Sequence, residues 1–478
     1  MELRKPILLP AKRAWIYAAL AVILGIILGA YLLGLSSADL PMGWFALLVL
    51  ASILPFIAVV TQDIKKFLMT LIILDINLAL DIRLFARPPN SGSLDGLLVS
   101  LTTISLSILY LLWVAELLAG KVKISLHKSI SLPALCFIAA GLLSVFNAKD
   151  PLLSAFELAL NIELFLVFFY LANNLRNSDD IRCITHVLLV GFLLAALSVI
   201  AMRLLGSYSF AGLGSETVVT GGEGIVRSGG LIIHPNPAAN VLMSLAMVAL
   251  ATLVTKGTTG FTRLLALVTL PLGVLALILT FSRGGWISFA VAGLVFTLLA
   301  LHRRWLRWQH VFWLIIVLSL LFFLFREPIL LRLFGDDAGS AAARRPLNII
   351  ALNMIRAHPW IGVGINNFMA VVQDYLTPET YGAWLASVHN KYLLVWSETG
   401  ILGILSYLLF FLAISKAAWR VWKRGDRLLS PLALAFMAAI LGRMVHMGVA
   451  RFVTRPDGQI LWLTAGIIAA MYNIERND

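Results

Sequence analysis

Apolar runs of about 18 or more residues recur along the whole chain, separated by short polar segments. At a rise of about 1.5 Å per residue, a helix of that length crosses a hydrocarbon layer of about 30 Å. The pattern therefore predicts an all-α fold, a polytopic bundle of about 12–14 membrane-spanning helices. The spans are placed at residues 14–35, 43–60, 67–83, 96–119, 131–147, 154–174, 183–206, 235–256, 263–281, 285–301, 311–325, 389–415, 431–450 and 459–474.

Three of these segments depart from a simple span. Basic residues precede 14–35, as in a signal peptide, but this run is too long and lacks a small-residue cleavage site, so we expect a retained first span. Segments 131–147 and 311–325 are short, which suits a tilted or re-entrant helix. Irregular backbone at membrane depth is tolerated only inside protein or beside a water-filled cavity.

The composition excludes a soluble protein. Of the 478 residues, 60% are hydrophobic and 13% are charged. Soluble domains have about 45–50% apolar and about 25% charged residues, so a soluble fold could not cover this much apolar surface. The cysteines, Cys136 and Cys183, lie in or beside apolar segments and form no disulfide or metal-ligand pattern.

Most of the 37 lysines and arginines fall in alternate loops. Because short cytoplasmic loops carry an excess of positive charge, we expect these loops and both termini on the cytoplasmic side. The residues are Arg4, Lys5, Lys12, Arg13, Lys65, Lys66, Lys121, Lys123, Lys128, Arg176, Arg182, Lys256, Arg263, Arg303, Arg304, Arg307, Lys416, Arg420, Lys423, Arg424, Arg427 and Arg476. The net charge of +13 then reflects topology and anionic membrane lipids, and no pattern points to nucleic acid.

The remaining basic residues lie on the outer side or within spans, where polar residues are usually functional. Two outer loops are long. The first, at about 206–234, is glycine-rich, and the second, at about 326–388, contains a helical pattern at about 345–357 that Pro359 stops. We divide the chain into N-terminal helices 1–206, a region 207–415 that carries the polar motifs, and C-terminal helices 416–478.

The first polar motif is Arg227 followed by IIHPNPAAN, which places His234 and Asn236 at the outer mouth of a span. Two prolines this close delay a regular helix, and the second suits the first turn of the helix that follows. A proline-marked helix start and a part in ligand binding explain this motif equally well.

The second motif, TFSRGG, lies between two long apolar spans. Arg283 has a planar guanidinium that can hold phosphate oxygens at two points. Ser282 can cap the next helix, whose N-terminus also favours an anion, and the two glycines allow close approach of a ligand. The alternative, an arginine that reaches back to the membrane interface, is weaker because small residues flank Arg283.

The third motif lies in the second long loop, where Arg344 and Arg345 lead the helical pattern that ends in HPWIGVGINNF. The positive-inside rule does not explain paired arginines on an outer loop. The alternative is a solvated loop charge. The turn GVGINNF is predicted to be a glycine-dependent connection with a structural role.

The fourth motif, HNKYLLVWSETGILG, begins with His389 and Asn390 at the mouth of a span. A neutral histidine can accept a proton, as a general base must, and Asn390 can orient it or hold a sugar hydroxyl. The alternative is an interfacial histidine without a catalytic role. Glu398 lies on the opposite helix face and is predicted to be a packing partner for another polar group.

The motifs HPNPAAN, SRGGW, HPWIGVG after an arginine-led helix, and HN followed by ETGILG occur in this order on one predicted face. Together they resemble the O-antigen ligase and O-antigen polymerase superfamily over about residues 220–410. The N-terminal half is similar only in being a series of spans. The resemblance makes 207–415, with its periplasmic loop 326–388, the catalytic region.

The resemblance implies an inverting membrane glycosyltransferase that takes a glycan from undecaprenyl diphosphate at the periplasmic face of the bacterial inner membrane. It implies no nucleotide sugar, metal or other cofactor. Ligases transfer the glycan to the lipid A core of lipopolysaccharide, and polymerases transfer it to a second lipid-linked repeat. The sequence favours ligase and polymerase almost equally, and the basic outer loops favour the ligase slightly. The arginines of these loops are Arg326, Arg332, Arg344, Arg345 and Arg356.

Carried over by motif, His389 is the catalytic base. The arginine doublet leaves one assignment open, so the diphosphate-binding residues are Arg283 and either Arg345 or Arg344. The candidate substrate-binding residues are Arg227, His234, Asn236, Ser282 and Asn390.

Two rival functions belong to other classes. A flippase or transporter of lipid-linked glycan would be expected to show two related halves with broken helices at matching positions. Here the polar motifs lie only in the C-terminal half, which favours chemistry. An intramembrane protease that uses Ser282 and His389 is disfavoured because no glycine–serine nucleophile motif lies within a span.

Overall fold

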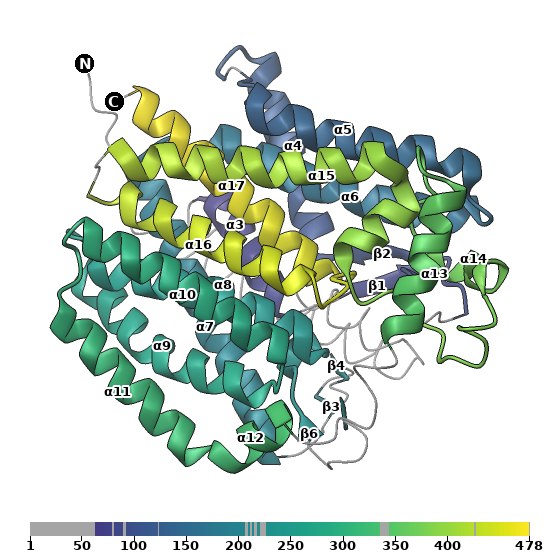
Figure 1. Ribbon diagram of the computed structural model, residues 1–478. Helices are drawn as coiled ribbons and strands as arrows, with labels where there is room; N and C mark the ends of the chain where they lie inside the picture. The colour runs from purple at the N-terminus through teal and green to yellow at the C-terminus, as the bar shows by residue number, and fades with distance from the viewer. Residues whose placement is uncertain are drawn as a thin grey trace, which may run out of the picture.

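The computed structural model describes residues 63–78, 81–88, 92–122, 124–205, 209–210, 213–214, 218–219, 226–334, 344–424 and 427–477. Over these residues the protein is a bundle of roughly aligned helices with three small two-stranded sheets (Figure 1). The predicted all-α class is therefore confirmed. The expected spans 14–35 and 43–60 lie outside the described residues.

Among the described residues, nine helices are long and apolar enough to cross a membrane. They are α4 (Leu101–Leu118), α5 (Lys128–Ser144, extended by the 3-10 turn η1, Val145–Asn147), α6 (Pro151–Asn174), α7 (Ser178–Leu205), α8 (Pro235–Val254), α9 (Gly260–Leu279), α10 (Arg283–His302), α15 (Lys391–Arg424) and α16 (Leu429–Met447). Each overlaps a predicted span. The protein is thus a multi-pass membrane protein.

The other helices are shorter or more polar. They are α3 (Ile64–Leu78), α11 (Trp308–Leu324), α12 (Arg326–Phe334), α13 (Arg344–Ala357), α14 (Phe368–Val371), α17 (Arg455–Asn477) and the 3-10 turns η2 (Gly230–Ile232) and η3 (Val372–Tyr375). The strands pair antiparallel as β1 (Asp81–Leu84) with β2 (Leu97–Ser100), β3 (Ser209–Phe210) with β4 (Leu213–Gly214), and β5 (Val218–Val219) with β6 (Val226–Arg227).

The span predicted at 67–83 is too long. Helix α3 ends at Leu78, and the chain then enters β1, in which Asp81 lies opposite Ser100 of β2. The outer parts of two predicted spans, 67–83 and 96–119, therefore form a β-hairpin. The stretch DIRL alternates polar and apolar residues, which suits a strand better than a membrane helix.

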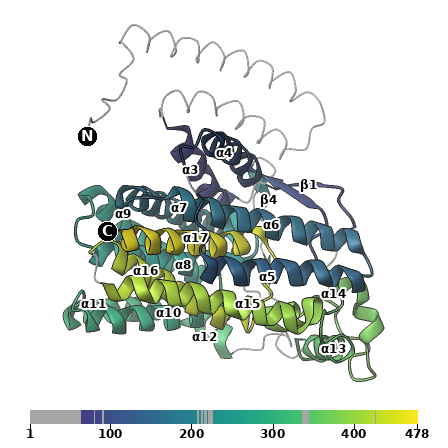
Figure 2. The ribbon, with the colours of Figure 1, turned by 90° about the horizontal axis from the view of Figure 1, so that it is seen from above.

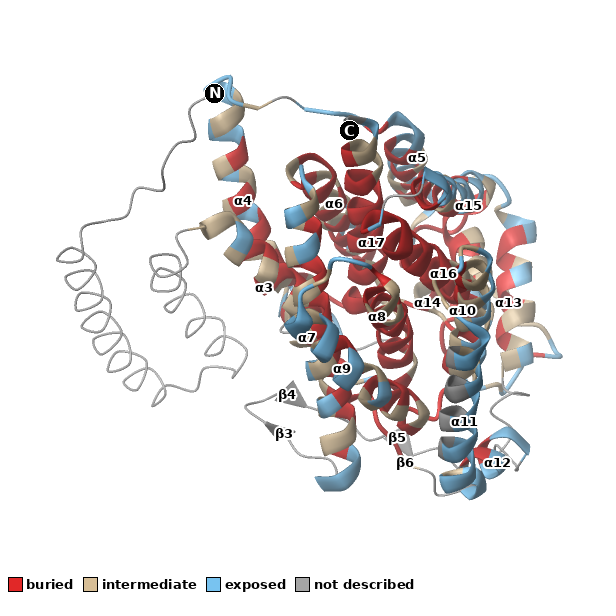
Figure 3. Ribbon diagram, turned by 90° about the vertical axis from the view of Figure 1, so that its left-hand side faces the viewer, coloured by how far each residue is buried: buried red, intermediate tan, exposed pale blue. Residues whose placement is uncertain are grey.

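Helices α8, α16 and α17 form the centre of the bundle, where nearly every residue is buried (Figure 3). Small residues allow this close packing: a Cβ on Gly442 of α16 would lie 2.7 Å from the carbonyl oxygen of Ser288 on α10. Helix α10 is the least buried of the nine candidate spans described, with apolar side chains such as Leu294 exposed on its outer face. That face suits contact with lipid.

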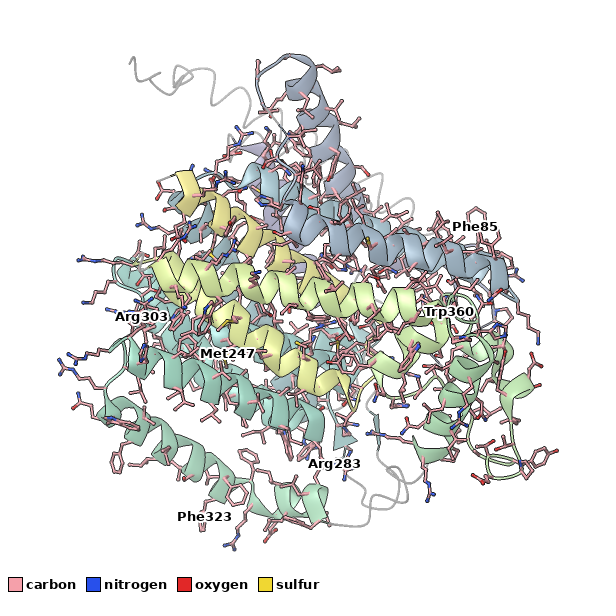
Figure 4. All side chains as sticks on the ribbon, turned by 45° about the horizontal axis from the view of Figure 1, so that its top comes forward. Phe85, Met247, Arg283, Arg303, Phe323 and Trp360 are labelled. Atoms are coloured by element: carbon pink, nitrogen blue, oxygen red, sulfur yellow. The ribbon has the colours of Figure 1, made fainter. Side chains whose placement is uncertain are left out.

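The two ends of the bundle differ. The strands, α13 and α14 gather at one end, which we call the strand end, and the C-terminus lies at the other, the terminal end (Figures 1 and 2). Arg283 and Arg303, at the two ends of α10, mark the strand end and the terminal end (Figure 4). At the terminal end Arg303 stacks on Trp422 at 5.0 Å and Lys423 on Trp419 at 5.2 Å, as cations anchored at a membrane interface do.

The motifs HPWIGVG, after α13, and ETGILG, in α15, pack against each other at the strand end. Helix α15 kinks at Gly400, whose φ is 66°, and the turn after α13 packs into the kink. The backbone N–H of Val363 donates to the carbonyl of Ser397 at 2.9 Å, and a Cβ on Gly362 would lie 2.3 Å from the carbonyl carbon of Glu398. The predicted glycine-dependent connection is confirmed. Glu398 is the predicted packing partner, accepting from the backbone N–H of Phe368 at 3.0 Å.

A buried ion pair holds the hairpin against the bundle. Arg455, at the start of α17, is 2% exposed and donates to Asp75 of α3 at 2.8 Å and to Asp81 of β1 at 2.6 Å. Charges taken out of water need partners of good geometry, and removing one partner leaves the other uncompensated. Arg455 therefore fixes three elements at the strand end.

We expect Arg455→Met to lower the free energy of unfolding by about 3–5 kcal/mol, because Asp75 stays buried without its cation and the half-buried Asp81 loses the same partner. Thermal unfolding of the purified protein in detergent measures this. The control is Arg182→Met, which removes an exposed pair with Asp179 and should change stability by less than about 0.5 kcal/mol. Equal melting temperatures for the two variants would contradict the prediction.

Candidate active site

Ser282 and Asn236 lie together at the strand end. Ser282 is the predicted cap of α10: its Oγ accepts from the backbone N–H of Gly285 at 3.2 Å. The same Oγ donates to the Asn236 side-chain oxygen at 2.9 Å, which joins the first turn of α8 to the start of α10. The first two sequence motifs therefore form one polar cluster.

Arg227 completes this cluster from β6. Its side chain is buried, and its Nε donates to the carbonyl oxygen of Thr280 at 3.1 Å. Its Nη2 donates to the Asn236 side-chain oxygen at 2.8 Å, so that one oxygen accepts from both Arg227 and Ser282. His234 precedes α8 with an exposed side chain, and α8 begins at Pro235, so the proline-marked helix start is confirmed.

Four arginines from four elements converge on this position. Burial and the positive charges of Arg332, Arg344 and Arg283 lower the pKa of Arg227 to about 9, so its guanidinium still carries a proton at neutral pH. Arg332 of α12 is 4% exposed and donates to the carbonyl of Phe281 at 3.2 Å. Arg344 donates to the carbonyl of Val449 at 3.4 Å. We call Arg227, Arg283, Arg332 and Arg344 the arginine cluster.

The two arginines at the start of α13 differ in burial and in their neighbours. Arg344 is half-buried, and its charge acts on both Arg227 and His389. Arg345 is exposed, whereas Arg344 donates to the Val449 carbonyl beside the start of α15. The geometry therefore favours Arg344 for the role that the sequence left open between the two.

His389 lies next to the arginine cluster, just before α15. Burial, the charge of Arg451 and the charge of Arg344 lower its pKa to about 4, against the opposing effect of the Ser387 carbonyl. The imidazole is therefore neutral at neutral pH, and its Nδ1 makes no hydrogen bond within the described part of the chain. Such a group can accept a proton.

Asn390 has a structural task. Its side-chain oxygen accepts from the backbone N–H groups of Tyr392 and Leu393, at 3.0 and 3.1 Å, and so caps α15. This cap fixes where the helix begins and thereby places the adjacent His389.

Three residues of the site were not singled out from the sequence. Arg332 was counted only with the basic outer loops, and Arg451 was not named, although both are outer-side arginines that the positive-inside rule leaves unexplained. His446 of α16 is 1% exposed, and its Nε2 lies 3.5 Å from the Ser282 Oγ. It stands in an apolar run that gave no signal. A Cβ on Gly284 would lie 2.6 Å from its ring, so the glycine makes room for this histidine.

The chemistry of this arrangement is anion binding beside a neutral base. Guanidinium groups hold phosphate or carboxylate oxygens at two points each. Among the residues that the structure describes, no three His, Cys, Asp or Glu side chains are grouped to hold a metal ion. Fold and site together define a multi-pass membrane protein with a candidate catalytic site for an anionic substrate.

Residues 265–408, about a third of the chain, match the model of the O-antigen ligase family. The resemblance drawn from the motifs is thereby confirmed. A search of curated proteins found no match. The matched segment contains Arg283, Arg332, Arg344 and His389, whereas Arg227 lies outside it.

We expect Arg344→Gln to weaken the binding of inorganic pyrophosphate, used as a probe, by about 10–150-fold, as expected for losing hydrogen bonds between charged groups. Titration of the purified protein in detergent measures the dissociation constant. Arg345→Gln is the matched control and should bind as the wild type does. If both variants lose affinity equally, the doublet acts only through its overall charge.

Proposed function

We propose that this protein transfers a glycan from undecaprenyl diphosphate to the lipid A core of lipopolysaccharide, at the periplasmic face of the bacterial inner membrane. The transfer inverts the anomeric configuration and needs no metal ion. One observation carries the proposal: the arginine cluster lies beside His389. Arg344 donates to the carbonyl of Val449, and the backbone N–H of Lys391, two residues after His389, donates to the adjacent carbonyl of Ala450. The family match over 265–408 supports the class of reaction.

The arginine cluster binds the diphosphate of the donor. As the bond between the anomeric carbon and the phosphate oxygen breaks, negative charge develops on the leaving diphosphate. Guanidinium groups already placed at that position stabilise the transition state more than the ground state. Arg283 and Arg344, which are half-buried, contact the diphosphate. Arg227 and Arg332 are more deeply buried and form the floor of the diphosphate site.

His389 accepts the proton of the acceptor hydroxyl. The acceptor oxygen attacks the anomeric carbon from the face opposite the diphosphate, a new carbon–oxygen bond forms, and the diphosphate leaves. Burial and the positive charges nearby lower the pKa of His389 and keep the free imidazole unprotonated, which is the state a base requires. Direct displacement of this kind inverts the configuration.

The orientation follows from charge. The terminal end carries Arg303, Lys423 and Arg424 stacked on aromatic rings, and the positive-inside rule assigns such an end to the cytoplasm. The strand end, with its arginine cluster, then faces the periplasm, and both termini are cytoplasmic. Exposed arginines outside the cluster, such as Arg356, suit the phosphorylated lipid A core and favour ligation.

The test is a reconstitution of the purified protein in liposomes with lipid-linked glycan and lipid A core. Glycan joined to lipid A core supports the proposal. Longer glycan on undecaprenyl diphosphate would make the protein a polymerase. Unaltered glycan in the opposite leaflet would make it a transporter.

In this assay we expect His389→Ala to lose about 10²–10⁴-fold in kcat, because no group remains to take the proton. Pyrophosphate binding should stay within about twofold of the wild type, since the arginine cluster is intact. His358→Ala, which removes a half-buried histidine after α13, is the control and should keep wild-type activity. Wild-type turnover in His389→Ala would show that His389 is not the general base.

The pH dependence follows from the lowered pKa of His389. A base must be unprotonated, so kcat/KM should hold as pH falls and decline only near pH 4, well below the usual histidine range. Bound diphosphate offsets the charge of Arg344, so the acid limb of kcat should lie at higher pH than that of kcat/KM. A decline of kcat/KM centred near pH 6.5 would speak against this environment for His389.

A further inference from the structure

We propose that Arg451 binds a phosphate group of the acceptor beside His389, and so determines which acceptors the enzyme accepts. This inference rests on the proposed glycan transfer. It assigns a specificity role to a residue outside the segment that matches the O-antigen ligase family.

Arg451 lies in the segment 448–454 that joins α16 to α17, and this segment runs between α13 and the start of α15. The carbonyl of Val449 accepts from Arg344 at 3.4 Å, and the carbonyl of Ala450 accepts from the backbone N–H of Lys391 at 3.1 Å. Arg451 itself donates from Nη1 to the Oγ of Ser387 at 3.3 Å. The segment is thus held next to His389 by both neighbours.

The connection between β1 and β2 supports Arg451 from the other side. Gly92 has a φ of 115°, and a Cβ there would lie 2.0 Å from the Ser387 Oγ and 2.7 Å from the Arg451 Nη1. The backbone of Leu94 is in turn fixed by two hydrogen bonds of 2.8 Å with the Asn366 side chain. Arg451 is therefore preorganised before a substrate arrives, which reduces the entropy lost on binding.

The charges divide into a donor side and an acceptor side. Arg451 donates to Ser387, two residues before His389. Arg227 and Arg332 donate instead to the carbonyls of Thr280 and Phe281, just before Arg283. Arg451 thus belongs to the surroundings of the base. In an inverting displacement the acceptor lies opposite the leaving diphosphate, so a cation beside the base contacts the acceptor.

A guanidinium beside the attacking hydroxyl is useful for binding when the acceptor carries a negative group, and its fork matches phosphate oxygens. The shared chemistry is a phosphate close to the accepting hydroxyl. Two sources supply it: a phosphorylated sugar of the lipid A core, or the diphosphate of a second lipid-linked glycan.

The test is Arg451→Gln in the reconstituted transfer assay, with the acceptor supplied intact or after phosphatase treatment. We expect the KM for intact acceptor to rise about 10–150-fold, while kcat and the KM for the donor change less than about threefold. The wild type should lose a similar factor on dephosphorylated acceptor, and the variant should not distinguish the two acceptors. Repeating the pair with lipid A core and with lipid-linked glycan shows which source supplies the phosphate.

Arg87→Gln, at an exposed arginine that follows β1 and pairs with Asp150, is the matched control and should keep the wild-type KM for both acceptors. Gly92→Ala provides a second route, because the added Cβ must displace Ser387 and Arg451; it should raise the same acceptor KM without changing any charge. If Gly92→Ala does not fold, the acceptor KM of Arg451→Gln still tests whether Arg451 binds the acceptor.

The outcomes separate the two proposals. If the wild type transfers no glycan, the proposed function fails. If the wild type transfers glycan and Arg451→Gln keeps the wild-type KM for phosphorylated acceptor, or raises the KM for the donor equally, only the role of Arg451 is overturned.

Discussion

Backbone carbonyls at the C-terminal ends of α9 and α16 hold arginines of like charge together at the strand end. Arg227 and Arg332 donate to the carbonyls of Thr280 and Phe281 after α9, and Arg344 donates to Val449 after α16. The carbonyls at a helix C-terminus carry a partial negative charge but no net charge. They attract guanidinium groups without cancelling their charge. The positive potential that the proposed anionic donor needs is thereby kept, and the position of each group is fixed.

The turns that expose these carbonyls are strained. Phe281 and Phe452 adopt φ values of 47° and 45°, a region that costs a residue with a side chain about 1–2 kcal/mol. Such strain persists only where the surroundings over-determine it. Here the buried centre does so: Asp457 of α17 accepts from Asn240 of α8 at 3.3 Å and from Thr454 at 2.7 Å. The buried helices α8, α16 and α17 thus support the strand end, while α10 turns an apolar face outward.

The sequence predicted the fold well where one helix accounts for one apolar run. It predicted the fold less well where a contact between residues distant in sequence determines where a helix ends. Span 67–83 was too long because Asp75 and Asp81 pair with Arg455, which stands far along the chain. The motif residues were found because polar groups stand out in apolar runs, and their convergence could not be read from spacing. The choice of Arg344 over Arg345 depends on the direction of each side chain, which adjacent identical residues do not reveal.

Positive charge alone does not identify the site, because both ends of the bundle are basic. At the terminal end Arg303 and Lys423 stack on tryptophan rings near the surface, where interfacial water and lipid head groups solvate them. At the strand end Arg227 and Arg332 are buried and bonded to carbonyls. Burying a cation is unfavourable unless a bound partner repays the lost solvation. The buried cations of the arginine cluster are bonded to neutral carbonyls, which suits the anion binding that we propose, whereas stacked cations at the other end suit a membrane surface.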